Sequence, residues 1–263
     1  MKYKIIIISF IIILCFYYGK RLYSYYLPAK ERDIYHTIQH KDDSIRIAYI
    51  GDSWADGHQD HNCIIANIIS NYLSKPVIIS SFGISGLTSK EIYNALFELD
   101  SFKQYMKMGY NYCFISAGIN DCNKKMSVTY YKKSMDCIIR FMLKNHIRPI
   151  ILDIPDYNIL DAFEKQTINK KLLCHLSMFV NGTQMDCKHQ FRDALNELIT
   201  DKGYQDKVSI IRYKTWNNNY ETNLKEMYIS DQIHLNDKGY IVLDSVIANI
   251  ILNIESCKAY QMK

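Results

Sequence analysis

The sequence has few of the residues that mark disordered, metal-binding or nucleic-acid-binding chains. Only four of its 263 residues are proline and ten are glycine, too few for a long disordered or low-complexity segment. It contains no Cys-x-x-Cys or histidine-rich spacing, so we expect neither a metal site nor a bound cofactor. Outside residues 1–32, basic and acidic residues are equal in number. This balance excludes the basic surface that a nucleic-acid partner requires.

One long hydrophobic run is present, and it lies at the N-terminus. Residues Ile5–Tyr18 are apolar except for Ser9, and Lys or Arg residues flank them on both sides. Because no small-x-small cleavage site follows, we favour an uncleaved membrane anchor within residues 1–32, with a cleaved signal peptide as the alternative. Residues 33–44 are polar and are expected to form a connector. The domain that follows is then tethered outside the cytoplasm or secreted, although the flanking charges do not fix the orientation.

The rest of the chain is rich in apolar residues that follow two alternating patterns. Short runs of β-branched and aromatic residues indicate strands, and apolar residues at helical spacing separate them. The expected strands cover residues 45–50, 76–80, 110–116, 149–154 and 208–213. Such alternation is typical of a parallel sheet with helices on both faces. We therefore predict one α/β domain over residues 45–258, a three-layer α/β/α sandwich with a five-stranded parallel sheet of flavodoxin-like type.

Four short polar blocks punctuate this pattern. Three of them come directly after predicted strands, and the fourth precedes the last helical pattern; the blocks are Gly51–Ser53, Gly83–Gly86, Gly118–Asp121 and Asp231–His234. The carboxyl ends of parallel strands meet at one edge of the sheet, where open α/β folds place their ligands. We expect the first three blocks to lie close together at that edge.

In this order the blocks resemble the GDSL/SGNH hydrolase family, over roughly residues 45–255. The resemblance implies the flavodoxin-like SGNH fold and a serine-dependent hydrolysis of ester bonds. The sequence departs from the family pattern at Trp54, where the family name has leucine, and lacks the asparagine that often precedes the glycine of the second block. We expect both differences to affect the shape of the pocket more than the catalytic residues.

The blocks contain the groups that serine hydrolysis needs. A serine hydroxyl is a weak nucleophile unless a base takes its proton, so Ser53 is paired with His234, whose ring a carboxylate from Asp231 would orient. The negative charge that develops on the substrate oxygen needs preorganised donors. The resemblance assigns these to the backbone N–H groups of Ser53 and Gly86 and to the side-chain amide of Asn120.

Other polar residues receive a structural interpretation. Asp121 is expected to shape a turn, and His58 and His61 are interpreted as solvated loop residues because His234 already supplies the base. Cys174 and Cys187 flank an Asn-Gly turn and are expected to pair if the compartment is oxidising.

The substrate is predicted less directly than the reaction. We expect an acyl ester, with an O-acetylated carbohydrate of the cell envelope favoured, a lipid or thioester as the alternative, and a catalytically silent glycan-binding protein as the third hypothesis. Residues 158–201 form an insertion whose apolar side chains decide between the first two; these are Leu172, Leu173, Leu176, Phe179 and Val180. If they pack on the sheet, the site is shallow and acetyl esters are preferred. If they cover the site, a lipid chain fits. The sequence leaves the oligomeric state open.

Overall fold

The computed structural model describes residues 19–20, 23–58, 62–217 and 219–261. Five parallel strands form one sheet in the order β2-β1-β3-β4-β5. The strands are β1 (Ile45–Gly51), β2 (Val77–Gly83), β3 (Tyr112–Ser116), β4 (Arg148–Leu152) and β5 (Ser209–Ile211). The predicted α/β fold with a five-stranded parallel sheet is confirmed.

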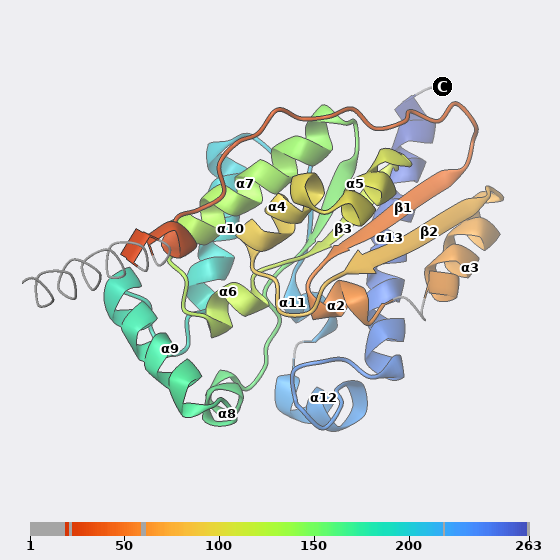
Figure 1. The fold of residues 1–263 in the computed structure, drawn as a ribbon. Coiled ribbons are helices and arrows are strands. Elements are labelled where there is room, and N and C mark those ends of the chain that lie inside the picture. The colour runs from red at the N-terminus through yellow and green to blue at the C-terminus, as the bar shows by residue number, and fades with distance from the viewer. Residues whose placement is uncertain (1–18, 21–22, 59–61, 218, 262–263) are drawn as a thin grey trace, which may run out of the picture.

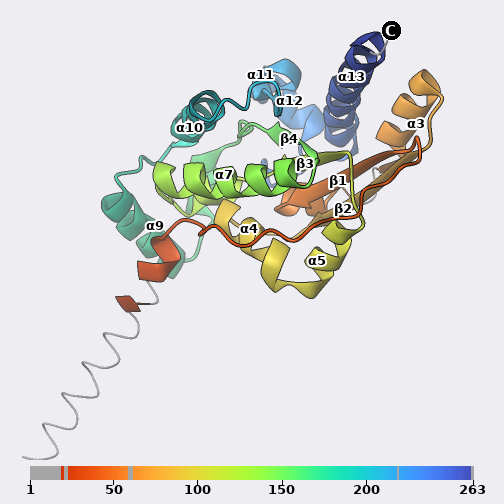
Figure 2. The ribbon, with the colours of Figure 1, turned by 90° about the horizontal axis from the view of Figure 1, so that it is seen from above.

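Helices cover both faces of this sheet (Figures 1 and 2). The helices are α2 (Ser53–Asp56), α3 (Asn62–Leu73), α4 (Ser89–Glu98), α5 (Asp100–Lys107), α6 (Ile119–Asn123), α7 (Val128–Lys144), α8 (Ile159–Glu164), α9 (Ile168–Asn181), α10 (Lys188–Asp201), α11 (Tyr213–Trp216), α12 (Tyr220–Met227) and α13 (Asp237–Gln261). On one face α4 packs between α5 and α7, and α10 packs beside α7; on the other face α3 packs against α13. The three layers follow from right-handed crossovers between parallel strands: the chain crosses on one face from β1 to β2 and on the other face once it runs from β2 past β1 to β3.

The helix boundaries follow from capping residues in the sequence. Thr88 and Glu91 form the predicted capping box at the start of α4, in which each side chain bonds the other residue's backbone N–H. Ser127 caps α7 by accepting a hydrogen bond from the N–H of Tyr130. These caps set the first residue of α4 and of α7. They thereby define where the chain segments at the carboxyl edge of the sheet end.

Helix α13 is long and apolar enough by composition to cross a membrane over Asp237–Lys258. Its Leu243, Ile247 and Ile251 side chains are fully buried in the domain core, however, and the helix packs along α3. A helix with one fully buried stripe is explained by core packing, so we assign α13 to the fold rather than to a membrane.

The chain that precedes β1 lies along the domain (Figure 1). The expected hydrophobic run falls outside the described residues, but residues 33–44, expected as a connector, follow the helices in extended form. The backbone N–H of Thr37 donates to the side chain of Asn145 at the end of α7, and the N–H of Ile38 donates to the carbonyl of Lys107 at the end of α5. The Tyr35 ring packs edge-on against Phe141. These contacts join the connector to one helical layer.

Candidate active site

Strand register brings the ends of β1, β2 and β3 into one row. Gly51 pairs with Gly83 on one side and with Ser116 on the other. A Cβ atom added at Gly51 would lie 2.1 Å from the Ser116 carbonyl oxygen, and one at Gly83 would lie 2.1 Å from the N of Asp56. Both positions therefore require glycine, because the loops approach each other more closely than a side chain allows. The predicted gathering of the first three blocks at one sheet edge is what the structure shows.

The residue between Gly51 and Ser53 holds this corner together. The Asp52 side chain is buried, and its Oδ1 accepts hydrogen bonds from the Ser116 hydroxyl (2.6 Å) and from the backbone N–H of Trp54 (3.1 Å). The second bond makes Asp52 the N-cap of α2, so that Ser53 is the first residue of this short helix. Burial raises the pKa of Asp52 to about 6, against these hydrogen bonds and the nearby charge of His234.

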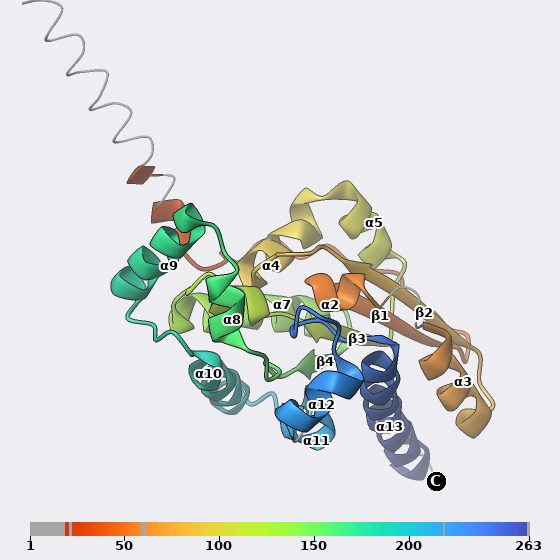
Figure 3. The ribbon, with the colours of Figure 1, turned by 90° about the horizontal axis from the view of Figure 1, so that it is seen from below.

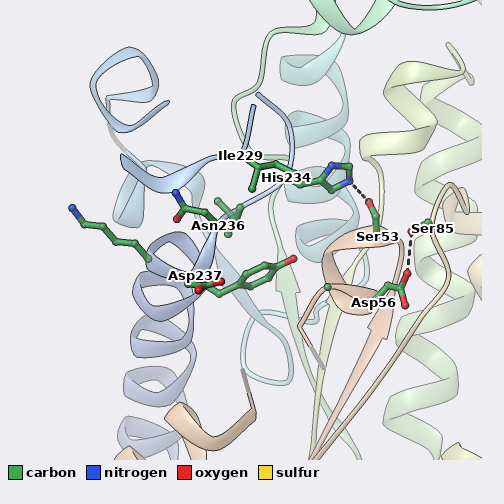
Figure 4. A pocket seen from close by; sticks show the side chains of 11 residues that line it. Ser53, Asp56, Ser85, Ile229, His234, Asn236 and Asp237 are labelled. Atoms are coloured by element: carbon green, nitrogen blue, oxygen red, sulfur yellow. Dashed lines mark hydrogen bonds between the residues drawn. The ribbon is translucent and has the colours of Figure 1, made fainter. Parts of the chain in front are cut away.

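The structure brings Ser53, His234 and Asp231 into one hydrogen-bonded chain. His234 Nε2 lies 2.7 Å from Ser53 Oγ (Figure 4). Nδ1 of the same ring lies 2.5 Å from Asp231 Oδ2. Burial raises the pKa of Asp231, but hydrogen bonds from the backbone and ring of His234 and from the N–H of Ile233 outweigh this and hold its pKa below the ordinary value. An ionised Asp231 favours the ring tautomer that leaves Nε2 free to accept the serine proton.

The loop that carries His234 is closed on itself. Between α12 and α13, the N–H of Ile229 donates to the carbonyl of His234 (2.9 Å), and Tyr228 and Leu235 form an antiparallel bridge. Gln232 at the tip has a left-handed φ of 63°, and the Tyr220 hydroxyl donates to its carbonyl. These short-range hydrogen bonds fix the position of the His234 ring relative to Ser53, the first residue of α2.

Of the two remaining predicted residues, Gly86 lies on the loop after β2, and Asn120 lies in α6, the short helix after β3. Gly86 has a φ of 84°, and a Cβ atom added there would meet nothing within 4 Å, so this residue borders open space. Its carbonyl accepts a hydrogen bond from Lys124 Nζ (2.9 Å). The Asn120 amide donates to the carbonyl of Leu87 (3.1 Å), which orients the side chain and leaves its second N–H for another acceptor.

Asp121 ties these two loops together, in keeping with the structural interpretation. It is buried, and its two carboxylate oxygens accept hydrogen bonds from the backbone N–H and the hydroxyl of Ser89, the first residue of α4. Burial raises its pKa to about 6 against these bonds. The carboxylate therefore joins α6 to α4 and has no access to a substrate.

Comparison with known proteins identifies the family. The profile of the GDSL-like lipase/acylhydrolase family matches residues 49–242. The chain belongs to this family. No curated protein matches it. Among solved structures, it is similar to a lipase/acylhydrolase from Enterococcus faecalis, with a TM-score of 0.55 and 17% identity over 79% of this chain and 95% of that one.

Two further structures share the fold. A GDSL-like lipase from Bacteroides thetaiotaomicron matches with a TM-score of 0.52 and 14% identity over 80% of this chain and 88% of that one. An acetyl xylan esterase matches with a TM-score of 0.52 and 15% identity over 79% of this chain and all (100%) of that one. At these identities the likeness supports the fold alone.

Two cavities lie beside the loops after β2 and β3, and no residue lines both of them. The first, of about 700 Å³, lies around Ser53 and His234; its lining includes the apolar side chains of Ile229 and Leu235 as well as Asp56 and Ser85, which bond each other at 3.0 Å (Figure 4). The second, of about 760 Å³, begins at Gly86 and Asn120 and extends to Tyr25, Tyr26 and α9. Both volumes lie in the range that holds small-molecule ligands.

The insertion does not pack on the sheet as the acetyl-ester prediction required. Leu172, Leu173 and Phe179 of α9 are 68%, 51% and 88% exposed, and Leu176 and Val180 are exposed as well. In the amphipathic helix α9 only Cys174 and Ser177 are buried. The physical premise for a shallow site is therefore wrong. The alternative, that these five residues cover a lipid chain, is not what the structure shows either, because only Leu173 among them lines the second cavity.

Two interpretations of polar and aromatic residues near the nucleophile are wrong. His58 is 1% exposed rather than solvated, and its Nε2 lies 2.5 Å from Oδ1 of Asp244 on α13, while its ring stacks on Tyr49. His61 lies outside the described residues. Trp54 packs edge-on against Trp216 in the core and lines neither of the two cavities. Asp244 lies among the buried, otherwise apolar positions of α13. This acidic residue was the signal in the sequence for a buried partner such as His58.

The cysteines also differ from the expectation. Cys174 and Cys187 are both free and buried. The Cys174 thiol lies 3.3 Å from the carbonyl of Asn123, whereas the thiol of Cys187 donates to the carbonyl of Cys122 (3.6 Å). The two flanking cysteines thus face different partners, because α9 and α10 diverge after the Asn-Gly turn.

The buried Asp52 carboxyl predicts a pH-dependent stability. Its pKa is about 6 in the folded protein and 3.8 in the exposed reference state, so the folded state binds the proton more tightly. Stability must then fall as pH rises from about 4 to about 6. Relative to Asp52→Asn, which stays neutral, the wild-type protein should lose up to about 3 kcal/mol across this window, measured by urea unfolding at several pH values. Exposed Asp43→Asn is the control, and parallel profiles for wild type and Asp52→Asn would contradict the assignment.

Proposed function

We propose that this protein is a carboxylic ester hydrolase that uses Ser53 as its nucleophile. The observation that carries the proposal is the chain from Ser53 Oγ through His234 to Asp231, with distances of 2.7 and 2.5 Å. As Ser53 Oγ attacks the ester carbonyl carbon, His234 Nε2 takes the hydroxyl proton. The tetrahedral intermediate then expels the alcohol, which receives that proton from His234. Water attacks the acyl-serine in the second half of the reaction, with His234 again as base.

The proposed oxyanion donors are the backbone N–H groups of Ser53 and Gly86 and the side-chain amide of Asn120. The Ser53 N–H lies at the start of α2, where the helix leaves its first N–H groups free of intrahelical partners. The hydrogen bonds of Lys124 to the Gly86 carbonyl and of Asn120 to Leu87 hold the other two donors in place before the substrate binds. Preorganisation of this kind lowers the barrier because no donor has to reorient as charge develops.

Two substrate classes compete for this chemistry. The sequence favours an O-acetylated envelope carbohydrate, and the fold shared with an acetyl xylan esterase is compatible with it. A longer acyl ester is the candidate that the cavity beginning at Gly86 and Asn120 favours, because most of the surface of that cavity is apolar. We further propose that residues 1–32 tether the enzyme to a membrane with its catalytic domain outside the cytoplasm, on the evidence of the Ile5–Tyr18 hydrophobic run.

A fluorophosphonate probe tests the nucleophile. The wild-type protein should be labelled covalently, because the probe's phosphorus reacts with a serine whose proton has an acceptor at 2.7 Å. Ser53→Ala should lose both labelling and ester hydrolysis while keeping its melting temperature. Ser85→Ala, which alters another hydroxyl of the same cavity, is the matched control and should remain labelled. Labelling that persists in Ser53→Ala would overturn the proposal.

Replacement of Asn120 tests the oxyanion assignment. Asn120→Ala should lower kcat by about 10²–10³-fold with a smaller change in KM, the usual effect of losing one such donor. The measurement is steady-state hydrolysis of a chromogenic ester with the thermal stability of each variant checked in parallel. A stable variant with near-normal kcat would restrict Asn120 to its bond with Leu87.

A further inference from the structure

The proton transfer from His234 to the leaving alcohol indicates which part of the ester faces each of the two cavities. His234 returns a proton to the leaving alcohol, so the alcohol must depart on the side of the imidazole. His234 lines the first cavity, together with Ser53, Asp56 and Ser85. Gly86 and Asn120, which would hold the carbonyl oxygen, line the second cavity instead. The acyl carbon chain, which is bonded to the same carbonyl carbon, would then extend past these two residues into the second cavity.

The wall of the second cavity comes partly from a segment outside the family match. Tyr25 and Tyr26 lie beside α9, as Figures 1 and 3 show for the start of the described chain. The Tyr26 hydroxyl lies 2.6 Å from Ser177 Oγ on α9. Lys90 of α4 donates to the carbonyl of Ser24 (2.7 Å), and the N–H of Ala29 donates to Ser134 Oγ on α7 (3.1 Å). Three helices thus hold this segment in place.

The lining fits a hydrocarbon chain. The Tyr25 and Tyr26 rings, Leu173 and Cys174 provide apolar surface away from the oxyanion loops. Burial raises the pKa of the Tyr25 hydroxyl above its ordinary value, which indicates an environment that disfavours charge. The polar groups Asn120 and Lys124 lie at the end where the ester would be held, and Gln166, Lys170 and Ser177 add polar groups at or next to α9. The apolar part of the lining is the part that an acyl chain would contact.

We infer that the cavity between Tyr25–Tyr26 and α9 binds the acyl chain of the ester substrate, and that this chain is of medium or greater length. The inference rests on the proposed function, and it gives the segment after the N-terminal hydrophobic run a second role, as one wall of the substrate site. The chain could belong to a soluble lipophilic ester or to an amphiphile in a bilayer. Both present the same hydrocarbon to the cavity.

The test compares chain-length selectivity in the full-length protein, held in detergent micelles. For the wild type, kcat/KM should be at least tenfold higher for p-nitrophenyl octanoate than for the acetate, since each methylene buried in a fitted cavity favours the longer ester. Leu173→Trp fills the lining and should lower the octanoate-to-acetate ratio at least tenfold. Leu172→Trp makes the same change at an exposed neighbour that does not line the cavity and should leave the ratio unchanged.

Three results would overturn the inference: a wild type that prefers acetate, an unchanged ratio in Leu173→Trp, or an equal fall in both tryptophan variants. Because the readout is a ratio, a loss of folded protein does not move it. Failure of the proposed function is distinguishable, since Ser53→Ala would then retain hydrolysis of both esters. A monoacyl phospholipid in phosphatidylcholine vesicles separates the sources. Its hydrolysis, lowered in Leu173→Trp, assigns a bilayer substrate, and hydrolysis of the soluble ester alone assigns a soluble one; either supports the acyl site.

Discussion

The close approach of three strand ends is the constraint on which the site depends. Gly51 lies in register with Gly83 and Ser116, and no side chain fits at either glycine. Asp52 then fixes the corner, because one buried carboxylate oxygen bonds the end of β3 and also caps the helix that begins with Ser53. Without this corner, the loops after β2 and β3 would not reach the nucleophile.

Two of the buried carboxylates, those of Asp52 and Asp121, differ in environment from the carboxylate of Asp231. Asp52 and Asp121 are shielded from solvent, and burial raises the pKa of each to about 6. Asp231 is half-buried and accepts three hydrogen bonds from N–H groups, so its pKa stays low and its charge is available to an imidazolium. The fold therefore separates the carboxyl groups that hold loops together from the one that assists His234.

The sequence allowed the strands and the four blocks to be predicted, because hydrophobic period and strand-end glycines are local signals. It did not reveal helix α5, in which only Phe102 and Met106 are buried, too few for a recognisable stripe. It also did not reveal contacts between distant segments. His58 meets Asp244 across 186 residues, and Tyr26 meets Ser177 across 151; both pairings depend on how helices pack, which no local pattern encodes.

The same limit explains the misjudged insertion. The apolar residues of α9 have helical spacing, which is compatible either with packing on the sheet or with an exposed face beside a cavity. Only the three-dimensional position of α9 next to Tyr25 and Tyr26 distinguishes these possibilities. The described end of the segment expected as an anchor lies against α4, α7 and α9.

Detection of a covalent acyl-enzyme tests directly whether Ser53 is the nucleophile. The full-length protein is mixed with an excess of p-nitrophenyl ester, quenched with acid in the pre-steady state, digested and analysed by mass spectrometry. We expect the acyl group to be bonded to Ser53 Oγ in amounts that match the burst of nitrophenol. Rapid hydrolysis with no acylated Ser53, or an acyl group bonded to a different residue, would contradict it.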